Sequence, residues 1–525
     1  MISLSYPNLP AMFWARAVER ADAPFLWYKI NDQYKSFSWN QIADDVMAVA
    51  ATLHKLGVQK GDRVVLISES RPEWLVADFA IMQLGAITVP GYTTHGVEDY
   101  RYLLDHSGAK LAIVSPSLAA KVQAASKAPV LLIDALEKGD PSNLPKVDIG
   151  LDDTACIIYT SGTEGNPKGV MLSHGALLHN CRAAYHIVKG LGIGREVFLS
   201  FLPLSHSYEH LAGHFFPVMI GAEIYYAEGA DALLKNMAEC RPTIMTAVPR
   251  LYEVIRSRIL QQVKRGSWLS QKLFAARSVP VLNILVRRKI KQKFGGRLKA
   301  FVSGGAPLQV EVGEFFQSLG VRVLQGYGQT ESAPLISCNL PGSEKIHTVG
   351  PIVPEVEVKI ADDGEILARG PNLMQGYWQN PEATSKTIID GWLHTGDIGH
   401  LDEDQHLVIT DRKKEIIVVS GGDNISPQRV EGILCLEPAI SQAMVYGDKK
   451  PYLTAVIVPN KDFDKLAATK AIEAANAKLS ALEKVKKFIM AEDAFTIENG
   501  LLTPTLKLRR RKIKEIYGER LEGLY

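Results

Sequence analysis

The sequence predicts an α/β protein in which a large N-terminal domain of mixed, largely parallel sheets is covered by helices and a small α+β domain follows. Two observations predict this class: strand-like and helix-like segments alternate through the first half, and the pattern changes after about residue 350. A chain of 525 residues is also too long for one ordinary core. We therefore expect at least two packed units.

In the first half, residues 40–56 read as an amphipathic helix, and residues 72–84 as a helix with proline in its first turn. Short apolar runs at 63–68, 87–90 and 111–115 read as strands between and after these helices. Repeated β-α-β units with apolar strands favour a parallel sheet that has helices on both faces.

After residue 350 the signals are those of an α+β domain. Two strand-like runs flank the turn at 362–364, which is typical of a hairpin. Further along we expect a helix at 427–436, strands at 443–446 and 453–458, and a helical region through the 460s to 480s. We place the domains at residues 1–411 and 412–525, with a charged, exposed joint at Arg412-Lys413-Lys414.

Composition excludes several classes of protein. The 59 Lys and Arg nearly balance 57 Asp and Glu, which gives no case for nucleic-acid binding. The five cysteines are scattered without a C-x-x-C pair, so a disulfide framework is not expected and a reducing cytoplasm fits best. No apolar stretch approaches the roughly 20 residues that span a bilayer. We expect a cytoplasmic protein, soluble or peripheral at the inner membrane surface.

The segment IIYTSGTEGNPKGVMLSH, residues 157–174, has the physical character of a phosphate cradle. Glycines let backbone N–H groups approach an anion, hydroxyls add donors, and Lys168 supplies positive charge. We expect a strand before this loop and a helix after it. It is not a Walker A loop. By composition alone, an ordinary Gly-rich surface turn is a comparable interpretation.

The order of residues in this loop closely resembles the signature of the AMP-forming adenylating family. That family includes acyl-CoA synthetases, peptide-synthetase adenylation domains and beetle luciferases. The resemblance implies that the loop binds ATP through Thr160, Ser161, Gly162, Thr163, Glu164, Gly165 and Lys168. Glu164 departs from the commoner Thr or Ser, and its acidic side chain would either repel a phosphate or help to hold Mg²⁺.

Two further motifs resemble the family's nucleotide site. The turn Ser303–Pro307 resembles the adenine pocket, with Gly304, Gly305 and Ala306 against the base, although a plain strand-to-helix turn would read alike. In the octapeptide Gln325–Ser332 the resemblance implies that Tyr327 stacks on adenine, Thr330 contacts the α-phosphate and Glu331 holds Mg²⁺. Its remaining nucleotide-site members are Gln325, Gly326, Gly328 and Gln329.

Three residues late in the chain match further family positions. Asp397 matches the aspartate that binds the ribose hydroxyls, and Arg412 matches an arginine that also reaches the ribose. Lys414, two residues on, matches the pivot about which the small domain moves, although a charged run such as DRKKE is commonly a solvated surface. Lys507 matches the lysine that enters the site during adenylation, although Leu506 replaces the usual glycine before it.

The resemblance implies activation of a carboxylic acid with ATP and Mg²⁺ to an acyl-adenylate, followed by transfer to coenzyme A. Lys507, Thr330, Glu331 and His206 would form the catalytic set, His206 lying in the motif FLPLSH before the acyl pocket. The LPLSHSYEH and LTPTLKL segments are most similar to long-chain fatty acid–CoA ligases. Alternatives are an acyl-AMP ligase that loads a carrier protein, a ligase for an aromatic or short-chain acid, and a silent nucleotide sensor.

Two basic runs, residues 287–299 and 507–514, would attract coenzyme A phosphates or an anionic membrane surface. Solvated helix faces are an equally good interpretation of the first run. The sequence indicates no oligomeric state.

Overall fold

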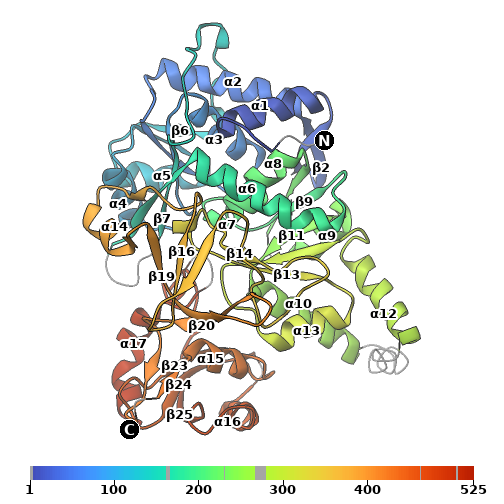
Figure 1. The fold of residues 1–525 in the computed structure, drawn as a ribbon, viewed down its shortest axis with the longest axis vertical. Coiled ribbons are helices and arrows are strands. Elements are labelled where there is room, and N and C mark those ends of the chain that lie inside the picture. Colours follow the sequence, from blue (N-terminus) through green and yellow to red (C-terminus); the bar gives the residue numbers. More distant parts are fainter. Residues whose placement is uncertain are drawn as a thin grey trace. The chain divides into compact units, whose positions relative to one another are not determined.

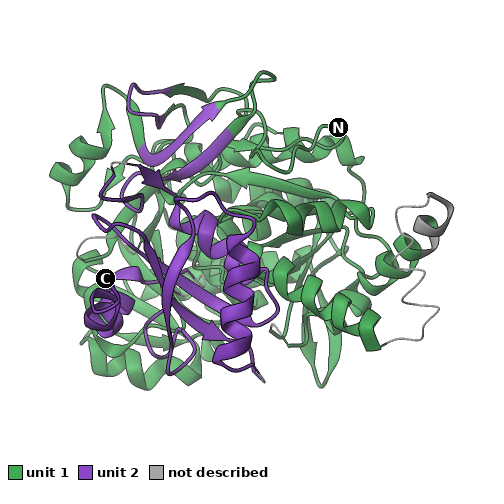
Figure 2. Ribbon diagram, turned by 90° about the horizontal axis from the view of Figure 1, so that it is seen from below, with its two compact units in different colours: residues 1–359, 367–394, 401–407 green, residues 360–366, 395–400, 408–525 purple. Residues whose placement is uncertain are grey.

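The computed structural model describes residues 4–160, 166–229, 231–265, 280–421, 423–461, 463–503 and 507–525. The chain forms two compact units (Figure 2). The large unit comprises residues 1–359, 367–394 and 401–407, and the small unit comprises residues 360–366, 395–400 and 408–525. The predicted class is confirmed: a large mixed α/β unit is joined to a smaller α+β unit.

The first sheet of the large unit has eight strands in the order β14-β13-β12-β11-β9-β10-β1-β2. Its inner pairs are parallel, and only the pairs at its two ends, β1–β2 and β13–β14, are antiparallel. The strands are β1 (Pro24–Ile30), β2 (Gln33–Ser38), β9 (Val197–Ser200), β10 (Glu223–Tyr226), β11 (Ile244–Ala247), β12 (Ala300–Ser303), β13 (Val323–Tyr327) and β14 (Ser337–Cys338).

The second sheet has seven strands in the order β17-β8-β7-β4-β3-β5-β6, and it is parallel from β7 to β6. Its strands are β3 (Arg63–Ile67), β4 (Ile87–Pro90), β5 (Leu111–Val114), β6 (Val130–Leu132), β7 (Thr154–Thr160), β8 (Lys168–Ser173) and β17 (Gly376–Tyr377). Val65, Ile67 and Val89 point to one core, which α4 and α5 cover. Val64 and Leu66 are equally buried on the opposite face. The predicted helix-covered parallel sheet is confirmed.

The helices of the large unit surround these sheets (Figure 1). They are α1 (Leu9–Arg20), α2 (Trp39–Lys55), α3 (Pro72–Gln83), α4 (Val97–Ser107), α5 (Pro116–Ala125), α6 (His174–Val188), α7 (Ser207–Glu209), α8 (Phe216–Ile220), α9 (Leu233–Cys240), α10 (Pro249–Arg265), α12 (Pro280–Lys293), α13 (Val310–Ser318) and α14 (Pro381–Thr387). The predicted helices at 40–56 and 72–84 correspond to α2 and α3. A π-helical turn, η4 (His210–Phe215), lies between α7 and α8.

A five-stranded sheet has the order β15-β16-β19-β18, with β20 beside β19. Its strands are β15 (Glu357–Ile360), β16 (Glu365–Arg369), β18 (Ile388–Ile389), β19 (Trp392–Leu401) and β20 (Leu407–Arg412). The predicted hairpin around the turn at 362–364 is the pair β15–β16. β21 (Ile417–Val418) and β22 (Asn424–Ile425) form a separate two-stranded ribbon.

The small unit contains a three-stranded sheet between two helical layers. The strands β23 (Ile440–Tyr446), β24 (Leu453–Pro459) and β25 (Val485–Met490) pack on one face against α15 (Pro427–Cys435) and α16 (Lys465–Asn476). Their other face packs against α17 (Arg510–Glu522). Apolar residues alternate along β24, with Ala455 and Ile457 in the first core and Val456 and Val458 in the second. Because both faces of β24 are buried, the strand is a nearly continuous apolar run in the sequence.

Two local predictions are wrong. A strand, β8, follows the phosphate-loop segment instead of a helix, because Val170 and Leu172 are buried members of a β-hairpin with β7. The helix begins later, where the Ser173 hydroxyl caps α6. The helical region of the 460s to 480s is also too long, since the Asn476 side chain bonds the backbone of Val485 and joins the end of α16 to β25.

Within the described residues, no helix is both long and apolar enough to cross a membrane.

Candidate active site

The phosphate-loop segment leaves the second sheet at the end of β7 and returns at the start of β8. Thr160 and Lys168 are paired across the hairpin, and the Thr160 hydroxyl donates to the Lys168 carbonyl at 3.5 Å. Gly169 is required here, because a Cβ atom would lie 2.8 Å from Ile157. The predicted ligands Ser161, Gly162, Thr163, Glu164 and Gly165 lie outside the described residues.

Glu331 and Lys168, far apart in the sequence, meet through Tyr377. The Tyr377 hydroxyl on β17 donates to Glu331 Oε1 at 2.8 Å, and Lys168 Nζ lies 4.7 Å from the centre of the Tyr377 ring. Burial and the Glu331 charge raise the pKa of Tyr377, so its phenol stays protonated and remains a donor. Sequence reasoning missed Tyr377. The only signal was a Gly-Tyr pair, which no spacing rule relates to Glu331.

Thr330 and His206 are brought together by Ser207. The Ser207 and Thr330 hydroxyls lie 3.0 Å apart. Ser207 opens α7, and His206 caps that helix by accepting a hydrogen bond on Nδ1 from the Tyr208 backbone at 3.2 Å. The cap fixes the orientation of the imidazole. The residue that follows His206 in the chain, Ser207, therefore contacts Thr330 directly.

The turn after β12 is shaped by Tyr208, which sequence reasoning did not select. The Tyr208 hydroxyl donates to the Val302 carbonyl at 2.8 Å, and its ring lies 3.1 Å from the place of a Cβ atom on Gly304. Gly305 has φ +82°, a conformation that favours glycine. Ala306, the third residue predicted for the adenine pocket, follows directly in the same turn.

The octapeptide motif occupies the end of β13 and the 3₁₀ turn η6 (Thr330–Ser332). Tyr327 is the last residue of β13 and Gly326 precedes it. Gly328 tolerates no side chain, because a Cβ atom would lie 2.1 Å from the Pro334 carbonyl oxygen. The Gln329 backbone N–H donates to the Ser332 hydroxyl at 3.1 Å and closes the turn. This rigid turn presents Thr330 and Glu331.

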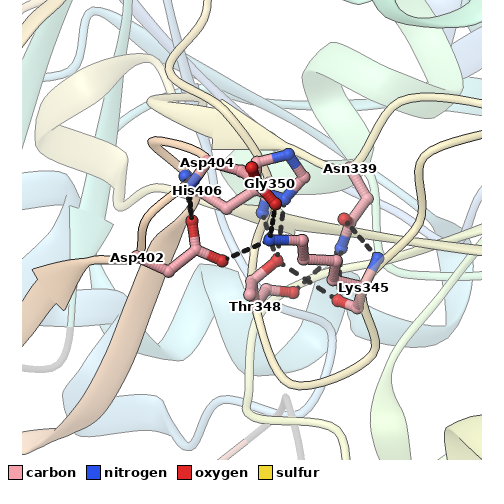
Figure 3. Close-up of polar contacts among 7 residues, drawn as sticks. All are labelled: Asn339, Lys345, Thr348, Gly350, Asp402, Asp404 and His406. Carbon is pink, nitrogen blue, oxygen red and sulfur yellow. Dashed lines mark hydrogen bonds and ion pairs between the residues drawn. The ribbon is translucent and has the colours of Figure 1, made fainter.

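The Gln325 side chain belongs to a polar network. Its side-chain amide donates to the backbone carbonyls of Ile346 and Thr348. Figure 3 shows the residues that hold this segment: Asn339 Nδ2 donates to the Thr348 carbonyl at 2.9 Å, and Lys345 Nζ binds Asp402 at 2.7 Å.

The hairpin before β20 provides the remaining contacts of this network. The His406 backbone N–H donates to Asp402 Oδ1 at 2.8 Å, and His406 Nδ1 lies 3.3 Å from the Thr348 hydroxyl (Figure 3). Asp404 adds a second carboxylate to Lys345 at 2.5 Å. This network holds the segment that contains Ile346 and Thr348. The Gln325 side chain, from β13, donates to the same segment.

The small unit carries a second group of predicted residues. Arg412 Nε, at the end of β20, donates to Asp397 Oδ1 on β19 at 3.1 Å, and Asp397 is buried. Desolvation and the Arg412 charge lower the pKa of Lys507 to about 8, while the carboxylates of Asp397 and Glu415 oppose that shift. These three predicted residues, Asp397, Arg412 and Lys507, thus share one electrostatic environment.

Thr503 and Lys507 are joined by two hydrogen bonds. The Thr503 N–H donates to the Lys507 carbonyl at 2.8 Å, and the Lys507 N–H donates to the Thr503 hydroxyl at 3.0 Å. The backbone of Lys507 is therefore fixed to Thr503.

Lys414 lies in an exposed turn between β20 and β21. Its neighbours are anchored within the small unit: Lys413 Nζ binds Asp363 at 2.6 Å and Glu365 at 3.0 Å. Glu415 binds Arg510 at 3.3 Å. Both neighbours of Lys414 thus pair with residues of the small unit, and the role of Lys414 as a pivot stays a prediction.

Comparison with known proteins gives concordant matches. The family described as AMP-binding enzyme matches residues 13–378, and the family described as AMP-binding enzyme C-terminal domain matches residues 414–525. The chain is 34% identical to the long-chain-fatty-acid–CoA ligase FadD15 of Mycobacterium bovis, over 99% of this chain and 97% of that protein.

Solved structures share the fold. The adenylation domain of a carboxylate reductase from Mycobacterium chelonae superposes with a TM-score of 0.85 at 23% identity, covering 99% of this chain and 92% of that chain. O-succinylbenzoate coenzyme A synthetase from Bacillus subtilis, in complex with ATP and magnesium ion, gives 0.77 at 24% identity, covering 97% and 99%.

Proposed function

The chain belongs to the AMP-binding enzyme family, and from this premise we propose that it is a fatty acid–CoA ligase that works through an acyl-adenylate. The observation that carries the proposal is the Glu331–Tyr377–Lys168 cluster. In it a carboxylate and a cation, both from motifs for which the sequence predicts ATP contacts, share contact with one tyrosine.

In the first step a carboxylate oxygen of the acid bonds to the α-phosphorus of ATP, and the bond to pyrophosphate breaks. Two anions must meet, so the protein's task is to position them and to stabilise the charge that develops. We assign phosphate contacts to Thr330 and Lys168, and a third contact to the ammonium group of Lys507. Removing one such group costs on the order of 10²–10³ in rate.

Glu331 fits the expected Mg²⁺. Carboxylate oxygens are the ligands this hard cation prefers, and the Tyr377 hydroxyl fixes the orientation of the Glu331 carboxylate. When bound, Mg²⁺ would neutralise phosphate charge. Asp397 and Arg412 would bind the ribose, with Gly304, Gly305, Ala306 and Tyr327 at the adenine. These assignments stay predictions.

In the second step the thiolate of coenzyme A attacks the acyl carbonyl and AMP leaves with its electron pair. We propose that the predicted small domain, residues 412–525, turns about Lys414 between the steps and withdraws Lys507. Boundaries at 1–411 and 412–525 would put that pivot at the start of the small domain.

A fatty acid is the proposed substrate because the curated relative is named for long-chain fatty acids and spans the whole chain. Contact of basic residues with an anionic membrane remains a further prediction, which salt-sensitive sedimentation with anionic vesicles would test.

The test is to supply ATP, Mg²⁺ and acids from acetate to oleate, together with aromatic acids, and to follow pyrophosphate and acyl-CoA. We expect acyl-CoA from one class of fatty acids. Pyrophosphate release that never yields acyl-CoA would instead indicate a carrier-protein acceptor, and activity on aromatic acids alone would replace the fatty substrate. ATP binding without any turnover would identify a silent sensor and reject the proposal.

A further inference from the structure

A second cluster of ionisable side chains lies inside the large unit and is not used by the proposed reaction. Asp78 projects from α3, and His210 and His214 project from the π-helical turn η4. The Nε2 atoms of both imidazoles lie 3.0 Å from the same oxygen, Asp78 Oδ2. All three side chains are fully buried.

The surroundings of this triad are aromatic. Trp74 meets both imidazoles edge-on, with ring centres 5.1 and 5.3 Å away. Phe79 stacks on His214, and Phe215 stacks on His210 at 4.5 Å. Aromatic side chains do not solvate a carboxylate, so a buried Asp78 anion requires a cation beside it. Among the described residues, only the two imidazoles form ion pairs with Asp78.

Polar atoms of the triad also lack partners. Asp78 Oδ1, His210 Nδ1 and His214 Nδ1 are buried and have no hydrogen-bond partner among the described residues. Most buried polar atoms in proteins are hydrogen-bonded, so three orphans in one cluster need an explanation. A cation bound by the two Nε2 atoms and by both oxygens of Asp78 would supply the charge and would give Asp78 Oδ1 a partner. It would leave the Nδ1 atom of each ring as it is.

The donor set indicates which cation. The possible ligand atoms of the three residues all lie within 4.8 Å of one another. Two imidazoles at i and i+4 with one carboxylate suit Zn²⁺, Co²⁺ or Ni²⁺, whereas Mg²⁺ prefers oxygen ligands. π-helical turns are frequent at functional sites, and this one carries both histidines.

We propose that Asp78, His210 and His214 bind one divalent transition-metal ion, with Zn²⁺ as the expected occupant. The ion would tie α3 to η4. This turn directly follows α7, the short helix that begins at Ser207 and is capped by His206. The role of the ion is structural: it fixes the helix that presents these two residues, separately from the Mg²⁺ expected at Glu331. The competing arrangement is a metal-free hydrogen-bonded triad in which one imidazole is protonated.

The experiment measures metal uptake by the full chain without ATP or acid, so its result does not depend on the proposed ligase reaction. Protein is incubated with Zn²⁺ alone or Co²⁺ alone, desalted and analysed for bound metal. We expect one bound ion per wild-type chain. With Co²⁺, we expect visible absorption bands typical of an ion that is bound by few nitrogen and oxygen ligands. Asp78→Asn and His214→Gln should lose that ion.

His179→Gln is the matched control, because His179 is another buried histidine, whose Nε2 lies 3.1 Å from the Pro354 carbonyl oxygen. It should bind the ion as wild type does. If triad variants fail to fold, the wild type alone decides: its melting temperature should rise with Zn²⁺ but not with Mg²⁺. Wild-type metal content no higher than in the triad variants would overturn the proposal. So would an imidazolium nitrogen NMR signal from either histidine in Zn²⁺-treated protein.

Discussion

The predicted nucleotide residues fall into two groups that the fold supports differently. In the large unit, Lys168 and Glu331 lie on a strand and a tight turn, joined by the Tyr377 hydroxyl. In the small unit, Lys507 lies outside any helix or strand, and Lys414 lies in an exposed turn. Groups held on strands are suited to positions that stay fixed through both steps, whereas loops and turns suit groups that serve one step.

Among the variants considered, Lys507→Ala should cause the greatest loss of rate, and this loss should be confined to adenylation. Loss of the ammonium group should lower adenylation by about 10²–10³, because one cation on the developing charge is removed. Thioester formation from supplied acyl-adenylate should change little. Single-turnover measurements of each half-reaction check this, with Arg511→Ala, an exposed neighbour on α17, as control. Equal losses in both steps would show that Lys507 is not confined to adenylation.

Lys414→Pro should separate the two steps in the opposite direction. Proline fixes φ near −65° and removes the N–H, so the turn loses its freedom to rotate. We expect near-normal pyrophosphate release and thioester formation lower by roughly 10-fold or more, as for steps gated by a conformational change. The matched control is Lys413→Ala, which removes the adjacent ion pairs but leaves φ free. A Lys414→Pro protein impaired equally in both half-reactions would exclude the pivot.

Tyr377→Phe tests whether the Tyr377 hydroxyl supports metal binding by Glu331. Removing the hydroxyl leaves Glu331 Oε1 without its donor, and loss of such an outer partner costs about 10–100-fold in metal affinity or activity. We expect a higher Mg²⁺ requirement in adenylation. Mg²⁺ titrations of the wild type and the variant measure this. An unchanged Mg²⁺ dependence would separate Tyr377 from the metal.

The smallest effect is a pH dependence. Because the pKa of Lys507 is lowered to about 8, its ammonium group is present below pH 8 and is lost as pH rises through that value. Adenylation should therefore fall about twofold by the pKa and further above it. Lys507→Arg should abolish this alkaline limb, since a guanidinium stays charged. An alkaline limb that persists in Lys507→Arg would assign the titration to another group.

Much of this molecule could be predicted from its sequence, and the failures have physical causes. Long amphipathic segments such as 40–56 carry their own periodicity, and short apolar runs such as 453–458 are typical of buried strands. The strand β8 was missed because Lys168 and Gly169 were assigned to the phosphate loop, while the pairing of β8 with β7 depends on contact between the two strands.

The same distinction holds for the candidate site. Motif residues with a fixed order, such as Thr330 and Glu331, were found from the sequence. Tyr377, Ser207 and Tyr208 were not, because each acts through one contact with a residue far along the chain. No local pattern encodes such a contact.

The most direct test of the central claim follows the oxygen atoms. Fatty acid labelled with ¹⁸O in its carboxylate is converted with ATP and coenzyme A, and the products are analysed by mass spectrometry. Attack on the α-phosphorus predicts one ¹⁸O in AMP and none in pyrophosphate. Unlabelled AMP, or label in any other phosphate product, would contradict activation through an acyl-adenylate.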